Sequence, residues 1–350
     1  MLFENIQQTL LQWAEELSAV STSAGHVIEL SLERSTSDDS VWVSPIVQRL
    51  ASSMALGFSV LEKELQTTWA CPNGISFYVA KNGLLHICVE EACLLQECEK
   101  FSISGYQPLK GQQARLTLPV VASERNSACR RARLWCLLYE DMAKSLGASV
   151  ARQEEGIEPE ITVNTQGVEN ISYLFQTLKI SPFEKQVSPE IIHAVENVYV
   201  GLERAGRPLN IEGGAFINLK NPLFSIFYAE HLIVSFHAQI RGLKVKVEEV
   251  ETASISNENE ALEIMRIVLI WRHLKVDAYG KADLRPAFLH AIALSEYVIK
   301  WYNGTCLWDE RNPEKVKARL FVLNAASLLL GDVLAWARFS LPESIDKNTK

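Results

Sequence analysis

The sequence predicts an α+β N-terminal domain, a mixed and mostly helical middle region, and an all-α C-terminal helical bundle. Two short apolar segments joined by Lys81-Asn82-Gly83 predict an antiparallel strand pair near the N-terminus. Four long segments with helical apolar spacing lie within residues 216–350. The chain has 350 residues, which is enough for two or three domains with a substantial core.

Residues 1–115 carry the signals of a small α+β domain. An amphipathic helix is predicted over residues 2–20, where apolar side chains recur at three- and four-residue steps. Residues 27–32 have the composition of a strand. Ser44-Pro45 predicts the start of a second helix, because proline in the first turn loses no helical hydrogen bond. We expect further strands at residues 75–79 and 84–89.

Residues 116–215 form a middle region with less regular patterning. A helix is predicted from Arg130 to Leu146, and Gly147 after it is typical of a helix C-terminus. Residues 153–170 are acidic and polar, which predicts a connector. Residues 171–204 are expected to be helical, with a break at Ser181-Pro182.

Residues 216–350 are expected to form the helical bundle. The predicted helices span residues 223–239, 260–276, 285–302 and 313–337. The last has three concordant start signals, which are Asn312 at the N-cap, Pro313 at the first helical position and Glu314 in the first turn.

Composition indicates a soluble cytoplasmic protein. Acidic residues interrupt the first apolar run, beginning with Glu4, so the N-terminus does not resemble a signal peptide. The most apolar stretch, residues 320–337, contains Asn324 and Asp332, which favours a buried helix over a membrane span. The seven cysteines are an odd number, so reduced thiols are expected. Cys88, Cys93 and Cys98 do not have zinc-site spacing, and neither a metal nor a cofactor is predicted.

Charge is distributed unevenly along the chain. The net charge of −8 disfavours a nucleic-acid partner, but residues 266–319 carry 10 Lys and Arg against 6 Asp and Glu, a balance of +4. A local positive surface is sufficient for contacts with RNA phosphates. The alternative is that these cations only solvate helix surfaces.

Both ends of the chain resemble one protein family. Near the C-terminus, Arg285-Pro286-Ala287-Phe288-Leu289-His290, Lys300-Trp301-Tyr302-Asn303 and Lys317-Ala318-Arg319-Leu320 resemble the DALR anticodon-binding bundle of arginyl-tRNA synthetases. Near the N-terminus, residues 45–51 and Pro72-Asn73-Gly74-Ile75-Ser76-Phe77 are similar to the additional N-terminal domain of that family. The resemblance implies contact with tRNA. The family reads the D-loop through an Asn and an aromatic, whose positions here hold Ser76 and Gly74.

The catalytic part of that family is reduced in this chain. No segment resembles the His-Ile-Gly-His or Lys-Met-Ser-Lys signatures. Residues 146–153 faintly resemble the segment on the C-terminal side of the first signature, so residues 116–215 are interpreted as a remodelled relic of the catalytic domain. Without these signatures nothing obvious holds ATP phosphates or stabilises the adenylate transition state, and aminoacylation is not expected.

Ten residues are the candidate RNA-binding set, and no catalytic or metal-binding residue is predicted. Trp301 and Tyr302 end a helix, where exposed rings stack on unpaired bases, although aromatics there also commonly fill a core. Cations around the following turn are expected to contact phosphates, with solubility as the alternative. These are Arg311, Lys315, Lys317 and Arg319, and the same surface is extended by Arg272, Lys275, Lys281 and Arg285.

These observations predict a non-catalytic tRNA-binding protein, with arginine tRNA as the favoured partner, acting as an adaptor for a tRNA-modifying or translation protein. Neither DNA nor a membrane is an expected partner. One alternative is a protein-interaction scaffold that has lost tRNA binding. The third is a residual arginine-tRNA ligase-like enzyme, which ranks last because no nucleophile–base pair stands out in the middle region.

Overall fold

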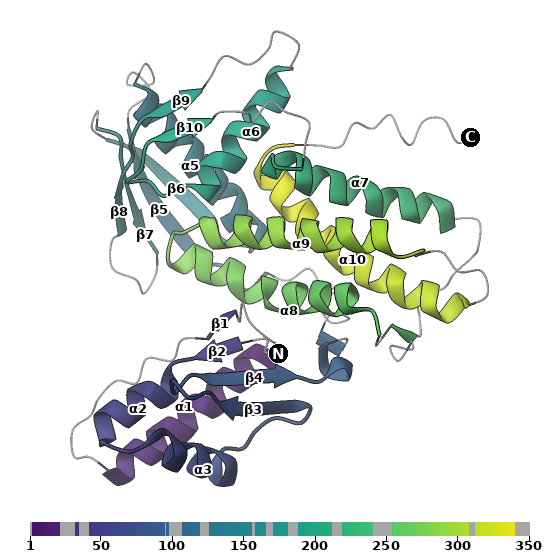
Figure 1. Ribbon diagram of the computed structural model, residues 1–350. Coiled ribbons are helices and arrows are strands. Elements are labelled where there is room, and N and C mark those ends of the chain that lie inside the picture. Colours follow the sequence, from purple (N-terminus) through teal and green to yellow (C-terminus); the bar gives the residue numbers. More distant parts are fainter. Residues whose placement is uncertain are drawn as a thin grey trace. The chain divides into compact units, whose positions relative to one another are not determined.

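A computed structural model of the chain divides into two compact units, Met1–Lys100 (unit 1) and Phe101–Lys350 (unit 2), shown in Figure 1. The structure describes residues 2–21, 32–34, 42–94, 96–97, 107–119, 126–155, 158–165, 171–180, 188–211, 219–240, 254–255, 257–307 and 312–339.

In the described part of unit 1, helices pack on an antiparallel sheet of four strands. The helices are α1 (Leu2–Ser21), α2 (Ile46–Met54) and α3 (Phe58–Thr68). The strands are β1 (Glu33–Arg34), β2 (Trp42–Ser44), β3 (Ile75–Val79) and β4 (Leu85–Val89), in the order β1-β2-β4-β3. The helices cover the sheet with apolar side chains, and the ring of Phe3 on α1 packs edge-on against that of Trp42 on β2, 5.5 Å away.

Two reciprocal hydrogen bonds join α1 to the end of α3. The indole of Trp13 donates to Thr68 Oγ1 at 3.1 Å, and the indole of Trp69 donates to Thr9 Oγ1 at 3.1 Å. Each bond satisfies a largely buried indole N–H, which would otherwise lose its hydrogen bond to water at a cost of about 1–3 kcal/mol. These two bonds therefore set how far α1 and α3 are shifted along each other.

The structure confirms the predicted first helix, second helix and hairpin of unit 1. Gly83 in the hairpin turn has φ +81°, a backbone conformation that favours glycine, and a Cβ there would lie 2.6 Å from the Phe58 ring. The strand expected at residues 27–32 falls almost wholly outside the described residues. The sequence did not predict α3, whose buried side chains are only Leu61 and Leu65 and whose N-cap is a glycine.

Unit 2 begins with a four-stranded sheet whose order is β6-β5-β7-β8. Its strands are β5 (Gln113–Leu118), β6 (Ser149–Glu154), β7 (Glu160–Asn164) and β8 (Ile171–Leu174). β5 and β6 are parallel and are joined by the helix α5 (Ser127–Ser145), while β7 and β8 are antiparallel additions. A βαβ crossover of this kind is the building unit of α/β nucleotide-binding domains.

Local signals position α5. The side chain of Asn126 caps its start by accepting from the Ala128 amide at 2.9 Å. At its end, the amides of Gly147 and Ala148 bond the carbonyls of Lys144 and Ala143, both at 3.0 Å, which is a Schellman ending. The predicted helix and its glycine C-terminus are confirmed.

Two predictions in the middle region are wrong. The predicted connector contains β7. Residues 171–180, expected to be helical, form β8 and the short strand β9 (Leu178–Ile180), because they pair with β7 and with β10 (Leu209–Ile211). The helical part of that prediction is confirmed for α6 (Pro189–Leu202), which is the crossover between β9 and β10 and is capped by Ser188.

Arg131 is a fully buried hub between these elements. Its guanidinium donates to the carbonyls of Gln176, Glu203, Arg204 and Arg207, with the bond to Arg204 at 2.9 Å. Loss of hydration lowers the pKa of Arg131, which nevertheless stays charged at neutral pH. One side chain on α5 thus fixes the backbone before β9 and the turn between α6 and β10.

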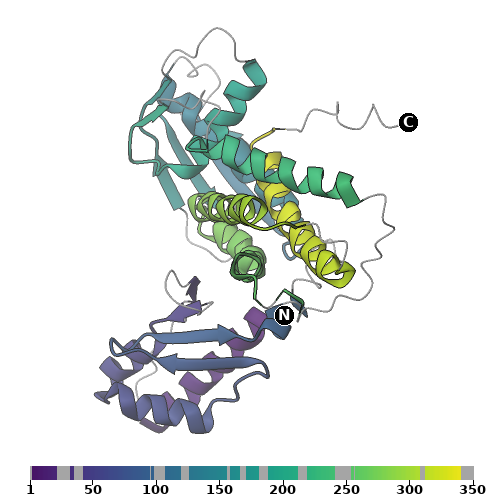
Figure 2. The same cartoon turned by 45° about the vertical axis from the view of Figure 1, so that its right-hand side comes forward.

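The rest of unit 2 is a four-helix bundle. Its helices are α7 (Pro222–Ile240), α8 (Asn259–Gly280), α9 (Arg285–Gly304) and α10 (Pro313–Trp336), each within a few residues of its predicted range. Figures 1 and 2 show α7, α8, α9 and α10 side by side. By length and composition α10 is the one helix among the described residues that could cross a membrane, but 67% of its apolar window is buried here.

Aromatic side chains join the bundle to the sheet within unit 2. Tyr139 on α5 stacks on Trp135 and on Tyr279 of α8, with ring centroids 5.3 and 5.7 Å apart, and its hydroxyl donates to the Tyr279 carbonyl at 2.8 Å. Burial raises the pKa of Tyr139, so this hydroxyl remains a donor. Asn197 on α6 adds a bond to the carbonyl of Ala337 at 3.0 Å.

We expect that Glu230→Gln will stabilise unit 2 at neutral pH. Glu230 is buried on α7, one carboxylate oxygen accepts from Ser327 at 2.7 Å, and the other has no partner among the described residues. Burial raises its pKa, so ionisation opposes folding as pH rises from the unfolded value through the folded value. The free energy of unfolding, measured with urea, should increase by about 1 kcal/mol at pH 7. This increase should vanish near pH 4. A gain independent of pH would contradict this explanation.

Candidate nucleic-acid interface

The turn between α9 and α10 is the region that the sequence singled out. After the turn, α10 starts as predicted. Asn312 Oδ1 accepts from the Lys315 amide at 3.0 Å, and Pro313 comes directly after this cap. α9 continues through Gly304, so Tyr302 and Asn303 lie in its last turn.

A buried carboxylate that the sequence did not predict joins the two helix ends beside this turn. Glu258 immediately precedes α8 and is only 8% exposed. It accepts hydrogen bonds from Arg319 Nη2 at 2.6 Å, from Lys315 Nζ at 2.9 Å and from the Trp301 indole at 2.9 Å. Arg319 also donates from Nη1 to the carbonyls of Cys306 and Leu307 at 2.7 and 3.0 Å. We call Glu258, Trp301, Lys315 and Arg319 the Glu258 network.

The electrostatics of this network favour an ionised carboxylate. Burial by itself would raise the pKa of Glu258, but hydrogen bonds from Arg319 and Lys315 more than offset it, and the pKa lies below its usual value. Three donors therefore share one buried negative charge, and the starts of α8 and α10 are tied to the end of α9. The described residues on both sides of the turn are therefore held together by this one carboxylate.

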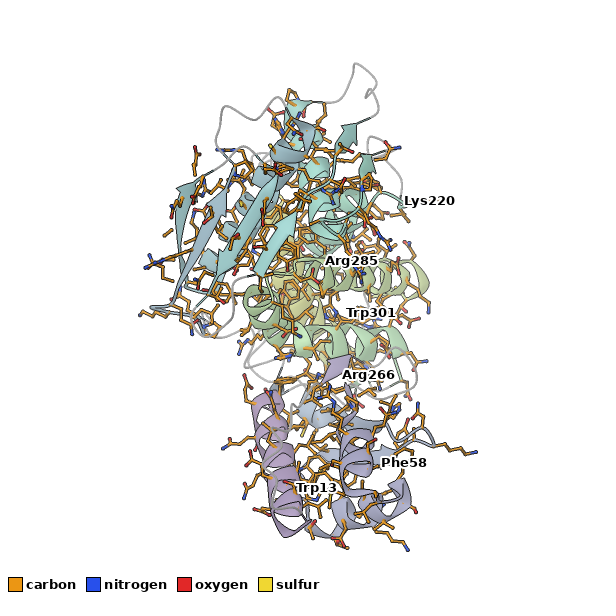
Figure 3. The ribbon with its side chains drawn as sticks, turned by 90° about the vertical axis from the view of Figure 1, so that its left-hand side faces the viewer. Trp13, Phe58, Lys220, Arg266, Arg285 and Trp301 are labelled. Atoms are coloured by element: carbon orange, nitrogen blue, oxygen red, sulfur yellow. The ribbon has the colours of Figure 1, made fainter. Side chains whose placement is uncertain are left out.

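Trp301 and Arg319 are therefore not direct RNA contacts in this structure. Trp301 is 0% exposed and lies inside the bundle (Figure 3), and Arg319 is 4% exposed. Contact with phosphates is therefore not needed to explain Arg319 at the start of α10. Glu258, 61 positions before Arg319, supplies the compensating charge.

Lys275 is also buried rather than available to a phosphate. It is 6% exposed, and its ammonium bonds Asp332 at 2.7 Å and lies 5.6 Å from the centroid of the Trp271 ring. Asp332 on α10 additionally accepts from the Trp271 indole at 3.1 Å. This pair connects α8 to α10 in the bundle core, so its role is structural.

Three predicted residues remain accessible beside the turn. Tyr302 is half-buried, and the side chains of Lys315 and Lys317 are 29% and 25% exposed. Lys317 pairs with Glu314 at 2.7 Å. Lys300, which the sequence analysis did not select, is 68% exposed one position before Trp301 and bonds Glu260 at 3.0 Å. A ring and three partly neutralised cations are thus available at this end of α9.

Three other predicted cations lie toward the opposite end of α9. Arg285 begins that helix, and at about 1.5 Å rise per residue it is about 25 Å from Tyr302. Lys281 is 70% exposed and pairs with Asp277 at 2.8 Å, and Arg272 is half-buried on α8. Arg285 makes no ion pair with any described residue. Arg311 lies outside the described residues. The expected single surface is therefore two separate groups.

In unit 1, the residues that resemble the D-loop segment of arginyl-tRNA synthetases lie in β3 and just before it. Ser76 is exposed on it, and Tyr78 is 39% exposed and stacks on His86 with centroids 4.6 Å apart. Gly74 has φ +76°, and a Cβ there would lie 2.1 Å from Cys93 Sγ. An aromatic side chain does not fit at position 74 without rearrangement.

The described residues contain no group of three or more His, Cys, Asp or Glu side chains that could hold a metal ion. Cys71 is half-buried, and burial raises the pKa of its thiol to about 11, so it is not a nucleophile at neutral pH.

Comparison with known proteins identifies the fold. The chain is similar to the arginyl-tRNA synthetase of Thermus thermophilus, with a TM-score of 0.72 at 8% identity over 98% of this chain and 100% of that one. The chain has an arginyl-tRNA synthetase-like fold. It is also similar to the Plasmodium falciparum arginyl-tRNA synthetase, with a TM-score of 0.57 at 5% identity over 96% and 98% of the two chains. No family model and no curated protein matches. The similarity confirms the predicted fold class.

Proposed function

We propose that this protein binds tRNA without charging it, prefers arginine tRNAs, and presents the bound tRNA to another protein such as a tRNA-modifying or translation factor. The observation that carries the proposal is an arginyl-tRNA synthetase-like fold over nearly the whole chain combined with a sequence that lacks both catalytic signatures. A cytoplasmic location is part of the same proposal, because tRNA is used there.

The end of α9 and the start of α10 support this proposal. The Glu258 network holds these two helix ends together, so an RNA loop that contacts them need not order them on binding, which lowers the entropic cost of association. Tyr302 offers a ring for an unpaired base, and Lys315 and Lys317 supply charge beside it.

Binding to purified tRNAs tests the proposal. In filter-binding or gel-shift titrations we expect arginine tRNAs to bind more tightly than other tRNAs, and affinity to fall steeply with salt because bound phosphates release counterions. Micromolar or weaker binding, no better than that of a random RNA hairpin, would end the idea. Arginine-dependent pyrophosphate exchange should give no turnover.

Tyr302→Ala is expected to reduce tRNA affinity roughly tenfold, because stacking on an aromatic ring contributes about 1–3 kcal/mol per base. Tyr302→Phe should bind as the wild type does, since the ring is retained. Tyr228→Ala on α7, which removes a half-buried ring stacked on Phe224, is the matched control and should leave affinity unchanged. Equal losses in both alanine variants would show that Tyr302 acts only through packing.

One observation favours the protein-interaction scaffold as a second candidate. Most predicted cations of the bundle are paired with carboxylates, including Asp332, Glu258, Glu314 and Asp277. Such pairing weakens the positive field that RNA needs. Charge reversal at Lys317 separates the two candidates, because it should impair tRNA binding and leave a protein partner on another surface bound.

A further inference from the structure

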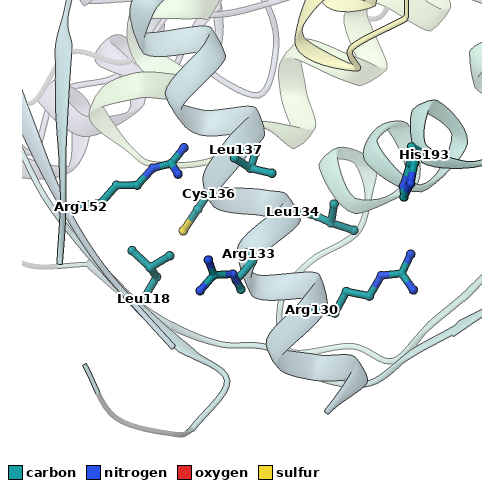
Figure 4. Close-up of a pocket in the computed structure, with 8 residues that line it drawn as sticks. All are labelled: Leu118, Arg130, Arg133, Leu134, Cys136, Leu137, Arg152 and His193. Carbon is teal, nitrogen blue, oxygen red and sulfur yellow. The ribbon is translucent and has the colours of Figure 1, made fainter. Parts of the chain in front are cut away.

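A pocket of about 490 Å³ lies on α5, away from the bundle helices that the sequence analysis selected (Figure 4). Its walls come from β5, β6, α5 and α6. They are formed by Leu118, Arg130, Arg133, Leu134, Cys136, Leu137, Arg152 and His193. Leu118 ends β5, and Arg152 lies in the carboxyl-terminal half of β6, so the pocket is at the edge where open α/β sheets bind ligands.

The lining combines an apolar floor with a cationic rim. Three guanidinium groups and one imidazole line the pocket, and no carboxylate is among its described lining residues. Each arginine pairs with a carboxylate that does not line the pocket. Arg130 bonds both oxygens of the fully buried Glu196 at 2.7 Å, Arg152 pairs with Glu140, and Arg133 bonds Glu154, whose side chain is 41% exposed, at 3.1 Å. The pairs of Arg130 and Arg152 each anchor the guanidinium through Nη2.

Arg130 and Arg152 keep donors that no other described residue uses. Among the described residues, Arg130 contacts Glu196 through Nη2 and its side chain is 44% exposed, and Arg152 contacts Glu140 through Nη2 and is 39% exposed. A guanidinium has five N–H donors, so Nη1 and Nε of these two lining residues remain available to a ligand. Oriented guanidiniums of this kind suit the bidentate geometry of a phosphate.

We propose that this pocket binds a backbone phosphate of RNA, as a second contact distant from the α9–α10 turn. The inference builds on the proposed function. The half-exposed rim fits a backbone that passes over the surface, whereas a small-molecule site encloses most of its ligand. In Figures 1 and 2, α5 lies at one end of unit 2 and the start of α10 at the other. Only an RNA long enough to span the unit reaches both.

Two RNA ligands and two variants test the pocket. The ligands are a full-length arginine tRNA and its isolated anticodon hairpin. The first variant is Arg152→Gln, in which Glu140 keeps its bond to Lys144 at 2.9 Å. The second is Arg130→Gln combined with Glu196→Gln, which leaves no buried carboxylate unpaired. Arg115→Gln on β5, an exposed arginine outside the pocket, is the matched control.

For each pocket variant we expect full-length tRNA affinity to fall roughly tenfold and the salt slope to decrease by about 1, while hairpin affinity stays unchanged. Arg115→Gln should match the wild type with both RNAs. Unchanged tRNA affinity in both pocket variants would overturn the inference, and so would an equal loss with the hairpin. Binding of ATP that depends on Arg152 while tRNA affinity is unaffected would assign the pocket to a small phosphorylated ligand instead. A wild type that binds no tRNA would reject the proposed function itself, which is a distinct result.

Discussion

Glu258→Ala is expected to destabilise unit 2 by about 3–5 kcal/mol, because it leaves the buried Arg319 without its counter-charge. Lys315 and the Trp301 indole lose the same acceptor. For a unit of this size, such a loss corresponds to a fall in Tm on the order of 10 °C. Urea and thermal unfolding followed by circular dichroism measure it. Glu296→Ala, on the exposed surface of α9, is the control and should change stability by less than about 0.5 kcal/mol.

A double variant separates the cost of leaving one buried charge unpaired from the cost of losing the side-chain packing. Glu258→Ala combined with Arg319→Met removes both charges, so no unpaired charge remains buried, and stability should partly recover relative to Glu258→Ala alone. If the double variant is as unstable as the sum of the two single variants, the coupling between these groups is absent and the account of the network is wrong.

The network also sets the direction of a pH dependence. The pKa of Glu258 is lower in the folded protein than in the unfolded chain, so its contribution to stability is complete above the unfolded value, about 4.3. That contribution is lost as pH falls from there through the folded pKa. The difference in unfolding free energy between the wild type and Glu258→Gln should therefore shrink below about pH 4.

Local signals predicted the elements whose ends are set by nearby residues. Asn312, Pro313 and Glu314 gave the start of α10, and Gly147 gave the end of α5, because a cap depends on residues within one turn. The turn at Gly83 was likewise predictable from three residues. Long helices with continuous apolar spacing completed the bundle.

Short strands were predictable only through their partners. β8 and β9 have four and three residues, too few to display an alternating pattern, and they are strands because β7 and β10 pair with them. The partner of β9 lies 31 positions away, and even β7, which is 8 to 14 positions from its partners in β8, leaves no mark within β8 itself. The helical interpretation of residues 171–180 failed for that reason.

The site was only partly predictable for a related reason. The sequence located the α9–α10 turn and its cations, but not which of them reach solvent. Trp301 and Arg319 are buried because they bond Glu258, and Lys275 is buried because it bonds Asp332. Both carboxylates are far from these residues in the sequence. The exposure of a side chain depends on the tertiary fold. A run of cations therefore predicts a positively charged helix start, but it does not show whether those side chains are accessible to RNA.

Arg131 illustrates the same point, and its replacement is the second large effect that we expect. It lies between Arg130 and Arg133, and its place in the sequence does not distinguish it from these neighbours. It is fully buried and donates to four backbone carbonyls, so that side chain holds the segments that lead into β9 and β10.

Arg131→Ala should cost about 3–5 kcal/mol, because it leaves a cavity and removes the donor from several buried carbonyls at once. Arg131→Lys should also be strongly destabilising, since one ammonium does not match the planar array of donors. Arg204→Ala, which removes an exposed side chain beside one of the bonded carbonyls, is the matched control and should be nearly neutral.

Hydrogen exchange adds a local readout, because amides of β9 and β10 should lose protection before those of the bundle. If Arg131→Ala costs less than about 1 kcal/mol, or if protection falls uniformly across unit 2, then β9 and β10 are held by the sheet and core rather than by this guanidinium.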